Sequence, residues 1–199
     1  MNSATSTSPA ETYFPASDGS RWKWKKTVTI GDETGPLKPT VFTSTLESRI
    51  VGQEHVDGIQ CFRVEMVDEF GNVVQTEHLS IRPDGHYRHS MNKDQFTPPL
   101  RILALPAKVG TRWKNSCTVQ GIRLSTSSNI EAEETITVPA GTFETIRVKV
   151  DAGLLTTTTW YAPGIGAVKQ SVNKSIQSQR DDSELEAFTP GDAPPAPKS

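Results

Sequence analysis

The chain has 199 residues, which is long enough for one large domain or two small ones with a core, and its apolar share of 34% is low for a fully globular chain. Lysine and arginine number 21 and aspartate and glutamate 23, so the net charge is −2. This balance argues against a nucleic-acid-binding face and against a basic membrane-binding face. No segment approaches the about 18 consecutive apolar residues that a transmembrane helix requires.

The two ends of the chain have the composition of disordered segments. Residues 1–11 consist mainly of Ser, Thr, Ala and Pro, and residues 190–199 form a Pro/Ala-rich tail. We therefore expect one folded domain over residues 12–189. The leader lacks the basic start and apolar run of a secretion signal. Two alternatives follow: a cytoplasmic protein, or one whose signal has been removed.

The first predicted strand, residues 22–25, alternates tryptophan with lysine, so both indoles face one side. Residues 62–66 alternate apolar with charged side chains, which is typical of a half-buried strand. Residues 146–150, farther along the chain, show the same alternation. Strands with one apolar face predict a sheet that is buried on one side and wet on the other.

The β-branched residues of 135–138 and 156–159 also suit a pleated surface. The most helix-like window, residues 181–188, is interpreted as a last strand, because no apolar period of 3.6 residues persists in the chain. Short strands separated by hairpin turns predict an all-antiparallel meander. The turn signals lie at residues 56–58, 69–72, 83–85, 139–141 and 163–166.

An internal repeat is visible in the sequence. Residues 15–23 and 106–114 share the pattern Pro-Ala-x-x-Gly-[Ser/Thr]-Arg-Trp-Lys. Arg63-Val64 and Arg147-Val148 follow in the same order, and so do the turns at 83–85 and 163–166. We interpret residues 13–96 and 104–189, approximately, as two copies of a unit of about five strands.

The duplication bears on the shape of the sheet. One copy alone would expose an apolar face and two sheet edges, so we expect the two copies to form one domain. A sheet of ten or eleven strands must curl, because strand twist accumulates across it. The sequence therefore predicts a strongly curved half-barrel or near-closed barrel with little or no helix.

Histidine and cysteine are the candidate metal ligands. His86 and His89 follow a turn, and His78 lies on the strand before it, so a hairpin could assemble a zinc or copper site. Residues three apart on a strand face opposite sides, however, so His86 and His89 co-ligate only if the strand bulges. We interpret the histidines as structural or surface residues and expect no metal and no cofactor. Cys61 and Cys117 are either bridged to each other or separate core thiols.

Catalytic motifs are absent from the sequence. It contains no Gly-x-Ser-x-Gly elbow, no Cys–His motif and no glycine-rich loop leading into a helix. Paired carboxylates could serve a glycosidase, and acidic residues cluster at 68–69, 131–134 and 181–186. These clusters border turns or alternate along strands, which is typical of solvated charge. We therefore expect no enzyme and assign no catalytic residue; a hydrolase is the minor alternative.

Three tryptophans, Trp22, Trp113 and Trp160, lie at landmarks of the repeat. A buried tryptophan removes 150–250 Å² from water in proteins generally, so packing in the core explains them sufficiently. The alternative is that some of them line an apolar cleft enclosed by the curved sheet.

Several motifs resemble a known group of proteins. Tyr13-Phe14-Pro15, Gly19 and residues 22–24 resemble the opening of the TapB-like proteins, an uncharacterised bacterial group. Residues 138–148 and 160–169 are similar to the core of the same group, so the resemblance covers nearly all of 12–189. It implies an all-β domain outside the cytoplasm, secreted or lipid-anchored, without assigned activity. More distantly, the implied fold is similar to periplasmic lipoprotein carriers, whose curved sheet wraps an apolar cavity.

Two functions follow from this architecture. In the first, the concave face of the sheet binds an apolar, lipid-like small molecule or a segment of a partner protein. In the second, the domain is structural or mediates protein interactions, and its core is filled. A cavity of at least about 300 Å³ lined by apolar side chains favours the first function. The matched residues are turn glycines and core aromatics, so the resemblance supplies no ligand-binding or catalytic residues.

Overall fold

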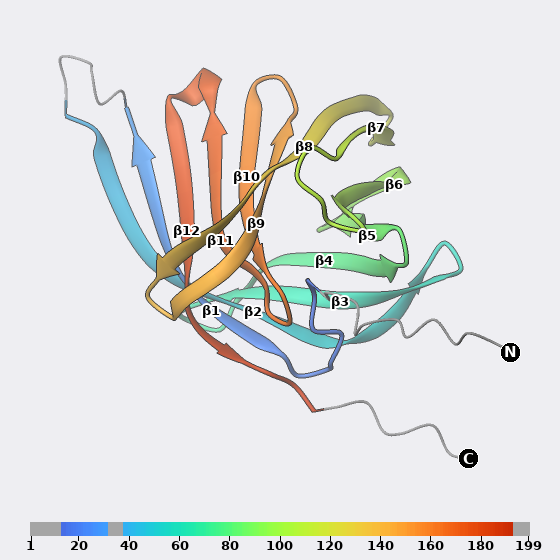
Figure 1. The fold of residues 1–199 in the computed structure, drawn as a ribbon, viewed down its shortest axis with the longest axis horizontal. Coiled ribbons are helices and arrows are strands. Elements are labelled where there is room, and N and C mark those ends of the chain that lie inside the picture. The colour runs from blue at the N-terminus through green and yellow to red at the C-terminus, as the bar shows by residue number, and fades with distance from the viewer. Residues whose placement is uncertain (1–12, 32–37, 193–199) are drawn as a thin grey trace, which may run out of the picture.

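A computed structural model describes residues 13–31 and 38–192, which form twelve β-strands (Figure 1). The predicted leader at 1–11 and most of the predicted tail, from residue 193 on, lie outside the described residues. The strands are β1 (Arg21–Ile30), β2 (Thr40–Val56), β3 (Ile59–Asp68), β4 (Val73–Arg82), β5 (Gly85–Met91), β6 (Asp94–Ala104), β7 (Arg112–Val119), β8 (Ile122–Val138), β9 (Gly141–Asp151), β10 (Leu155–Ala162), β11 (Gly166–Lys174) and β12 (Gln179–Thr189).

Each strand pairs antiparallel with its neighbours in sequence, and β1 also pairs with β12, which closes the barrel. The closing pair runs from Arg21 opposite Thr189 to Ile30 opposite Gln179. The only helical element in the described residues is a 3-10 turn at Ser175–Gln177. Across the described ranges, no helix has the length and apolar composition needed to cross a membrane. The predicted all-β antiparallel meander is thus confirmed.

The strand count and the degree of closure differ from the prediction. The barrel has twelve strands and is closed, where ten or eleven strands and a half-barrel or near-closed barrel were expected. The additional strand in the first half is β6, which the sequence does not predict because Pro98 and Pro99 have no N–H to donate to a ladder. The structure accommodates both prolines where β6 pairs with β7 through Thr97 and Thr118 alone. Each half therefore contains six strands.

Two long strands bend the sheet into its closed shape. β2 and β8 are both 17 residues long, and each contains a bulge, between Ile50 and Gly52 in β2 and between Ile130 and Ala132 in β8. A bulge adds a local bend and increases twist, so strands on either side of it change direction. In Figure 1, β9 to β12 run upright while β3 and β4 run across the view.

The interior contains three apolar clusters rather than one continuous core. One is built around Trp22, Trp24 and Leu185, a second around Leu103 and Trp113, and the third contains Phe96, Leu100 and Cys117. In β1, Trp22 and Trp24 are buried while Lys23 and Lys25 are exposed, as the alternation predicted.

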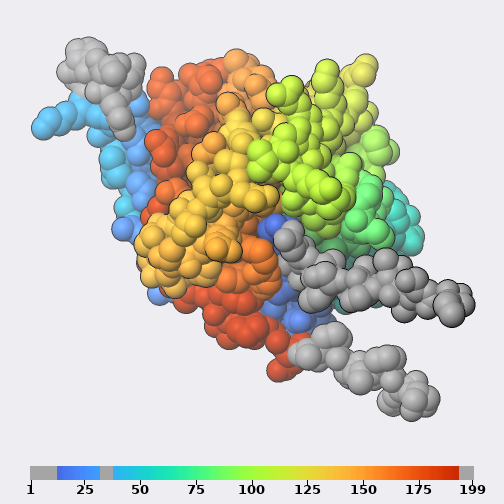
Figure 2. Space-filling view, viewed as in Figure 1, coloured from blue at the N-terminus to red at the C-terminus, as the bar shows by residue number. Residues whose placement is uncertain are grey.

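The ends of the described barrel meet. The N–H of Gly191 donates a hydrogen bond to Ser20 Oγ at 3.0 Å, so the packed chain continues past the expected boundary at residue 189. A side chain on Gly191 would lie 2.1 Å from the Asp18 carbonyl oxygen, which makes this contact specific to glycine. The segment before β1 and the segment after β12 thus lie on one side of the molecule (Figure 2).

Candidate ligand cavity in the barrel

The barrel encloses two adjoining chambers. The outer chamber has a volume of about 370 Å³ and the inner chamber about 140 Å³. Residues that line both chambers form the neck between them, and four of its five side chains are polar. The neck consists of Arg88, Ile102, Thr159, Tyr161 and Gln170.

Apolar side chains make up most of the outer chamber. They come from β5 to β10 and comprise Met91, Phe96, Leu100, Leu124, Val148, Val150, Ala152 and Leu155. Ala152 and Leu155 flank the β9–β10 turn, so the chamber extends to that end of the barrel. At this end Leu154 is 60% exposed and Ile176 is 75% exposed, and Ser175 N donates to Leu154 O at 3.0 Å, which joins the two turns.

Aromatic rings dominate the inner chamber. Phe14, from the segment before β1, lies 6.2 Å from Trp22 and 6.2 Å from His86 between ring centroids. Trp22 Nε1 donates to the Ile165 carbonyl at 2.7 Å, and Trp24 Nε1 donates to Ser48 Oγ at 3.1 Å. Both indoles therefore have their polar atom satisfied and present their apolar surface to the chamber.

An ion pair enters the lumen beside the neck. Arg88 on β5 donates from Nε to Oε2 of Glu77 on β4 at 3.0 Å, and Gln75 Nε2 donates to Oε1 of the same glutamate at 2.5 Å. Across the neck, Gln170 Nε2 donates to Thr159 Oγ1 at 3.2 Å. Burial raises the pKa of Tyr161, so its hydroxyl keeps its proton at neutral pH. The neck is a polar ring between the two chambers, and the outer chamber has further polar side chains in Arg101, Asn115, Thr126 and Thr157.

His86 contributes an unpaired polar atom to the inner chamber. Its side chain is 2% exposed, and Nε2 has no hydrogen-bond partner among the described residues. Burial lowers the pKa of His86 to about 4, so the imidazole is neutral at pH 7.

The histidines do not converge on one site. His86 lines the inner chamber, whereas His89 Nε2 lies 2.9 Å from Ser80 Oγ, and Ser80 alternates with the lumen residues Leu79 and Ile81. His78 is bonded elsewhere, with Nδ1 2.7 Å from Ser90 Oγ. Within the described parts of the chain, no group of three or more His, Cys, Asp or Glu side chains could hold a metal.

The two cysteines are free and buried. Cys61 lies on β3 and Cys117 on β7. The sequence left open whether the two cysteines are bridged or are separate core thiols, and in the structure they are separate. Burial raises the pKa of both thiols, which lowers their reactivity.

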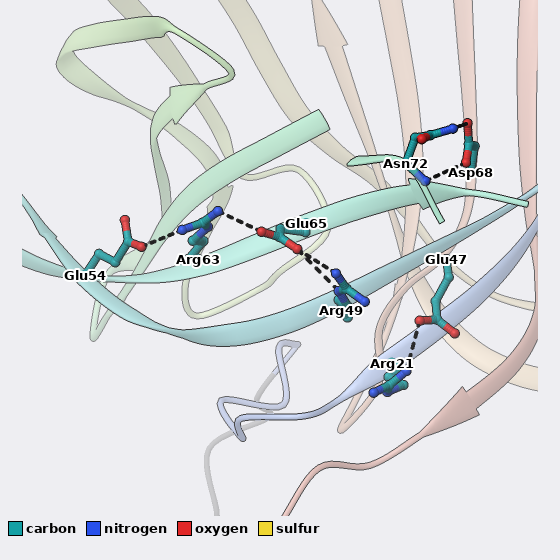
Figure 3. Close-up of polar contacts among 8 residues, drawn as sticks. All are labelled: Arg21, Glu47, Arg49, Glu54, Arg63, Glu65, Asp68 and Asn72. Atoms are coloured by element: carbon teal, nitrogen blue, oxygen red, sulfur yellow. Dashed lines mark hydrogen bonds and ion pairs between the residues drawn. The ribbon is translucent and has the colours of Figure 1, made fainter. Parts of the chain in front are cut away.

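Charged residues of β2 and β3 form a chain of ion pairs on the outer face of the sheet (Figure 3). Glu65 lies between two arginines, accepting from Arg49 Nη2 at 2.9 Å and from Arg63 Nη2 at 2.7 Å. The hydrogen bond from Arg49 is the main cause that lowers the pKa of Glu65. Arg63 Nη1 also donates to Glu54 Oε1 at 2.8 Å. Glu54 and Glu65 are therefore engaged in ion pairs on the outer surface of the sheet.

The predicted acidic clusters lie in similar ion pairs. Asp181 is 3.0 Å from Lys174 Nζ and 3.7 Å from Lys26 Nζ. Asp68 accepts hydrogen bonds from the Asn72 backbone and side chain within the β3–β4 turn (Figure 3). Their role as paired or turn-forming surface charge agrees with the interpretation from sequence.

The three landmark tryptophans occupy different environments. Trp22 lines the inner chamber, and Trp113 is packed in the second cluster. Trp160 lies on the opposite side of its strand from Tyr161, where Nε1 donates to Glu134 Oε1 at 2.6 Å and Lys169 Nζ lies 5.7 Å from the ring centroid. Trp113 is therefore a core residue, Trp22 is a core residue that also lines the inner chamber, and Trp160 is half-buried against the first cluster beside Glu134.

Sequence reasoning missed Arg88 and Glu77. A signal was present: Glu77 shares the phase of Leu79 and Ile81 on β4, so a charge occurs at a position where alternation expects an apolar side chain. A charged residue in the buried phase indicates a partner inside the barrel. That partner, on the next strand, is visible only once the register between β4 and β5 is known.

The fold and the cavity define a class: closed antiparallel barrels that enclose an apolar lumen with a polar neck. Residues 117–179, less than half of the chain, match the family described as DUF3108-like. No curated protein matches the sequence. The TapB-like assignment is a resemblance of motifs.

Two solved structures are similar to this chain. The first is a candidate lipoprotein of Parabacteroides distasonis, with a TM-score of 0.51 and 15% identity over 89% of this chain and 98% of that chain. The second is a candidate exported protein of Bacteroides fragilis with a YmcC-like fold, with a TM-score of 0.47 and 14% identity over 88% of this chain and 98% of that chain. The first likeness shows a shared fold.

Proposed function

We propose that this barrel is a non-catalytic domain that binds an apolar, lipid-like small molecule in its outer chamber. The observation that carries the proposal is the chamber of about 370 Å³ lined mainly by apolar side chains. A ligand-binding pocket in proteins generally has this size and lining, with a few polar groups that orient the ligand. The exposed Leu154 and Ile176 make the end of the barrel to which the chamber extends apolar as well.

Binding accounts for the lumen better than catalysis does. Glu77 is engaged by Arg88 and Gln75, and His86 is neutral, with no hydrogen-bond partner at Nε2 among the described residues. General acid–base chemistry needs a carboxylate or imidazole within reach of the reacting proton and a suitable pKa. The lumen supplies shape and hydrogen-bond donors.

We further propose that the domain works outside the cytoplasm. The TapB-like motifs support this location, and the fold shared with a candidate lipoprotein is compatible with it. Fractionation of the native cells tests the location, because a protein recovered with the cytoplasmic fraction would contradict it.

Binding is tested with N-phenyl-1-naphthylamine, an uncharged probe that fluoresces in apolar surroundings. Thr157 lines the outer chamber, and Thr158 faces the other side of β10. Phenylalanine at 157 fills part of the chamber, so Thr157→Phe should weaken probe binding at least about tenfold. Thr158→Phe is the matched control and should leave binding unchanged. Absence of probe binding by the wild type, or equal binding by Thr157→Phe, would show a filled or inaccessible core and favour a structural domain.

A further inference from the structure

The polar neck has a chemistry that narrows the ligand class, given the proposed binding function. We infer that the ligand is a single acyl chain ending in a carboxylate, with the chain in the outer chamber and the carboxylate on the guanidinium of Arg88.

Arg88 has terminal guanidinium nitrogens that the described part of the protein does not engage. Its Nε donates to Glu77, but among the described residues its two terminal nitrogens have no hydrogen-bond partner. Arg88 lines both chambers and its side chain is 24% exposed, so a ligand in the lumen can reach the guanidinium. Guanidinium N–H groups in an apolar cavity need acceptors, and a carboxylate matches the planar fork with two parallel hydrogen bonds.

Other arginines of the same barrel show the complete arrangement. Arg63 donates to two carboxylates, Glu54 at 2.8 Å and Glu65 at 2.7 Å. Arg147 likewise pairs with two glutamates, at 3.2 Å and 3.0 Å. Arg88 has one carboxylate partner, Glu77, and an open edge toward the cavity. A ligand carboxylate would give Arg88 the second partner that the other two arginines find within the protein.

The rest of the neck favours an acceptor-only head group. The Tyr161 hydroxyl is protonated and can donate, and the Gln170 amide has a second N–H besides the one directed at Thr159. An ionised carboxylate accepts hydrogen bonds and donates none. An ammonium head group has donors only, so it could not accept hydrogen bonds from Arg88, Tyr161 and Gln170.

The outer chamber sets the length of the chain. At about 30 Å³ for each atom of the size of a water molecule, a volume of about 370 Å³ holds roughly twelve methylene-sized groups. A chain of roughly ten to fourteen carbons therefore fills the chamber while its head lies at the neck.

The inference is tested by displacing N-phenyl-1-naphthylamine with dodecanoic acid or with methyl dodecanoate, at about pH 8, where the acid is ionised. The ester keeps the chain and the carbonyl and loses the charge. The wild type should bind the acid at least about tenfold more tightly than the ester, because hydrogen bonds to charged groups are the stronger ones. A ratio near one in the wild type would overturn the inference on its own.

Variants assign the preference to Arg88. Arg88→Met leaves Glu77 as an unpaired charge and could unfold the barrel, so Glu77→Gln/Arg88→Met, which removes both charges, is the main variant. In this double variant the ratio of acid to ester affinity should fall to about one. Arg21→Met, on the outer face, is the matched control and should keep the wild-type ratio.

The outcomes separate this inference from the proposed function. Probe binding without a preference for the acid, or a preference that persists in the double variant, would contradict the carboxylate and leave an apolar cavity that binds other ligands. Absence of probe binding by the wild type would contradict the binding function itself.

Discussion

Glu54 and Glu134 hold equivalent positions in the two halves of the barrel. Glu54 on β2 accepts from Arg63 on β3 at 2.8 Å, and Glu134 on β8 accepts from Arg147 on β9 at 3.0 Å. Each glutamate lies two residues past the bulge of its long strand, and each arginine pairs in register with the residue at the end of that bulge.

A ring nitrogen completes each arrangement. His78 on β4 places Nε2 3.0 Å from Glu54, and Trp160 on β10 donates from Nε1 to Glu134 at 2.6 Å. We propose on these contacts that β7–β12 is a second copy of β1–β6, with the ring residue exchanged. Superposing the halves of an experimental structure tests this proposal, since Trp22 should coincide with Trp113; unrelated backbone paths would contradict it.

The Glu134–Arg147 pair should contribute measurably to stability. A double-mutant cycle with Glu134→Ala and Arg147→Ala, followed by urea unfolding, should give a coupling free energy of about 0.5–1 kcal/mol. The pair is partly shielded by Trp160, whereas Arg21–Glu47 is more open, with a side-chain exposure of 54% for the arginine. The same cycle at Arg21–Glu47 is the control. Equal coupling at the two sites would contradict the role of shielding.

Trp113 should be among the most sensitive residues of the second half. It is 9% exposed, packs with Leu103 and Ile130, and donates from Nε1 to the Arg101 carbonyl at 2.9 Å. Trp113→Ala should lower the free energy of unfolding by about 3–5 kcal/mol, as expected for a large cavity in a core. Lys114→Ala, at the exposed neighbour, should change it by less than about 0.5 kcal/mol. A loss below about 1 kcal/mol for Trp113→Ala would contradict core packing.

His86 should make the barrel less stable as the pH falls. Its pKa of about 4 in the folded state lies below the ordinary histidine value of 6.5, so the unfolded state takes up the proton first. Stability is therefore complete above about pH 6.5 and decreases as the pH falls toward 4. Between pH 7 and 5 the loss should be about 2 kcal/mol.

Replacing His86 tests whether its imidazole causes the loss of stability between pH 7 and 5. His86→Leu should flatten the dependence of unfolding free energy on pH in this interval, measured by urea titration. His55→Leu, at an exposed position of β2, should leave the dependence as in the wild type. A wild-type slope that persists in His86→Leu would argue against a neutral, buried imidazole.

Cys61 and Cys117 should resist modification in the folded protein. Burial both covers the thiols and raises their pKa, so little thiolate is available. With 5,5′-dithiobis(2-nitrobenzoic acid), we expect two thiols to react in urea and the reaction without urea to be about a hundredfold slower. Cys61→Ser leaves Cys117 as the one thiol and assigns the rates. Absence of any reactive thiol in urea would indicate that Cys61 and Cys117 are bridged to each other and would contradict the free thiols.

Much of the fold was predictable from local patterns. Alternation in residues 22–25 placed both indoles inside, and residues 181–188 form the last strand despite their helical composition. The exception is β6, where Pro98 and Pro99 concealed a strand. Local patterns identify strands well because the period of two is a property of the backbone itself.

The candidate site was less accessible from the sequence. Glu77 is a charged residue in the inward phase of β4, but its partner Arg88 lies on another strand, and the register between β4 and β5 depends on a bulge. His86 was considered as a metal ligand and instead lines the inner chamber beside Phe14. Side chains from distant parts of the chain meet there only because the sheet closes.

The amino-acid sequence alone predicted that this protein is an antiparallel meander and that both indoles of residues 22–25 face one side of the sheet, and its second half repeats motifs of its first. Those properties depend on neighbours along the chain. The tertiary structure decided that β1 meets β12, that the halves have six strands each, and that the lumen contains a cavity with Arg88 at its neck. Closure of the barrel depends on the twist accumulated over the whole sheet and on bulges at a few positions. A local sequence pattern does not predict this total twist.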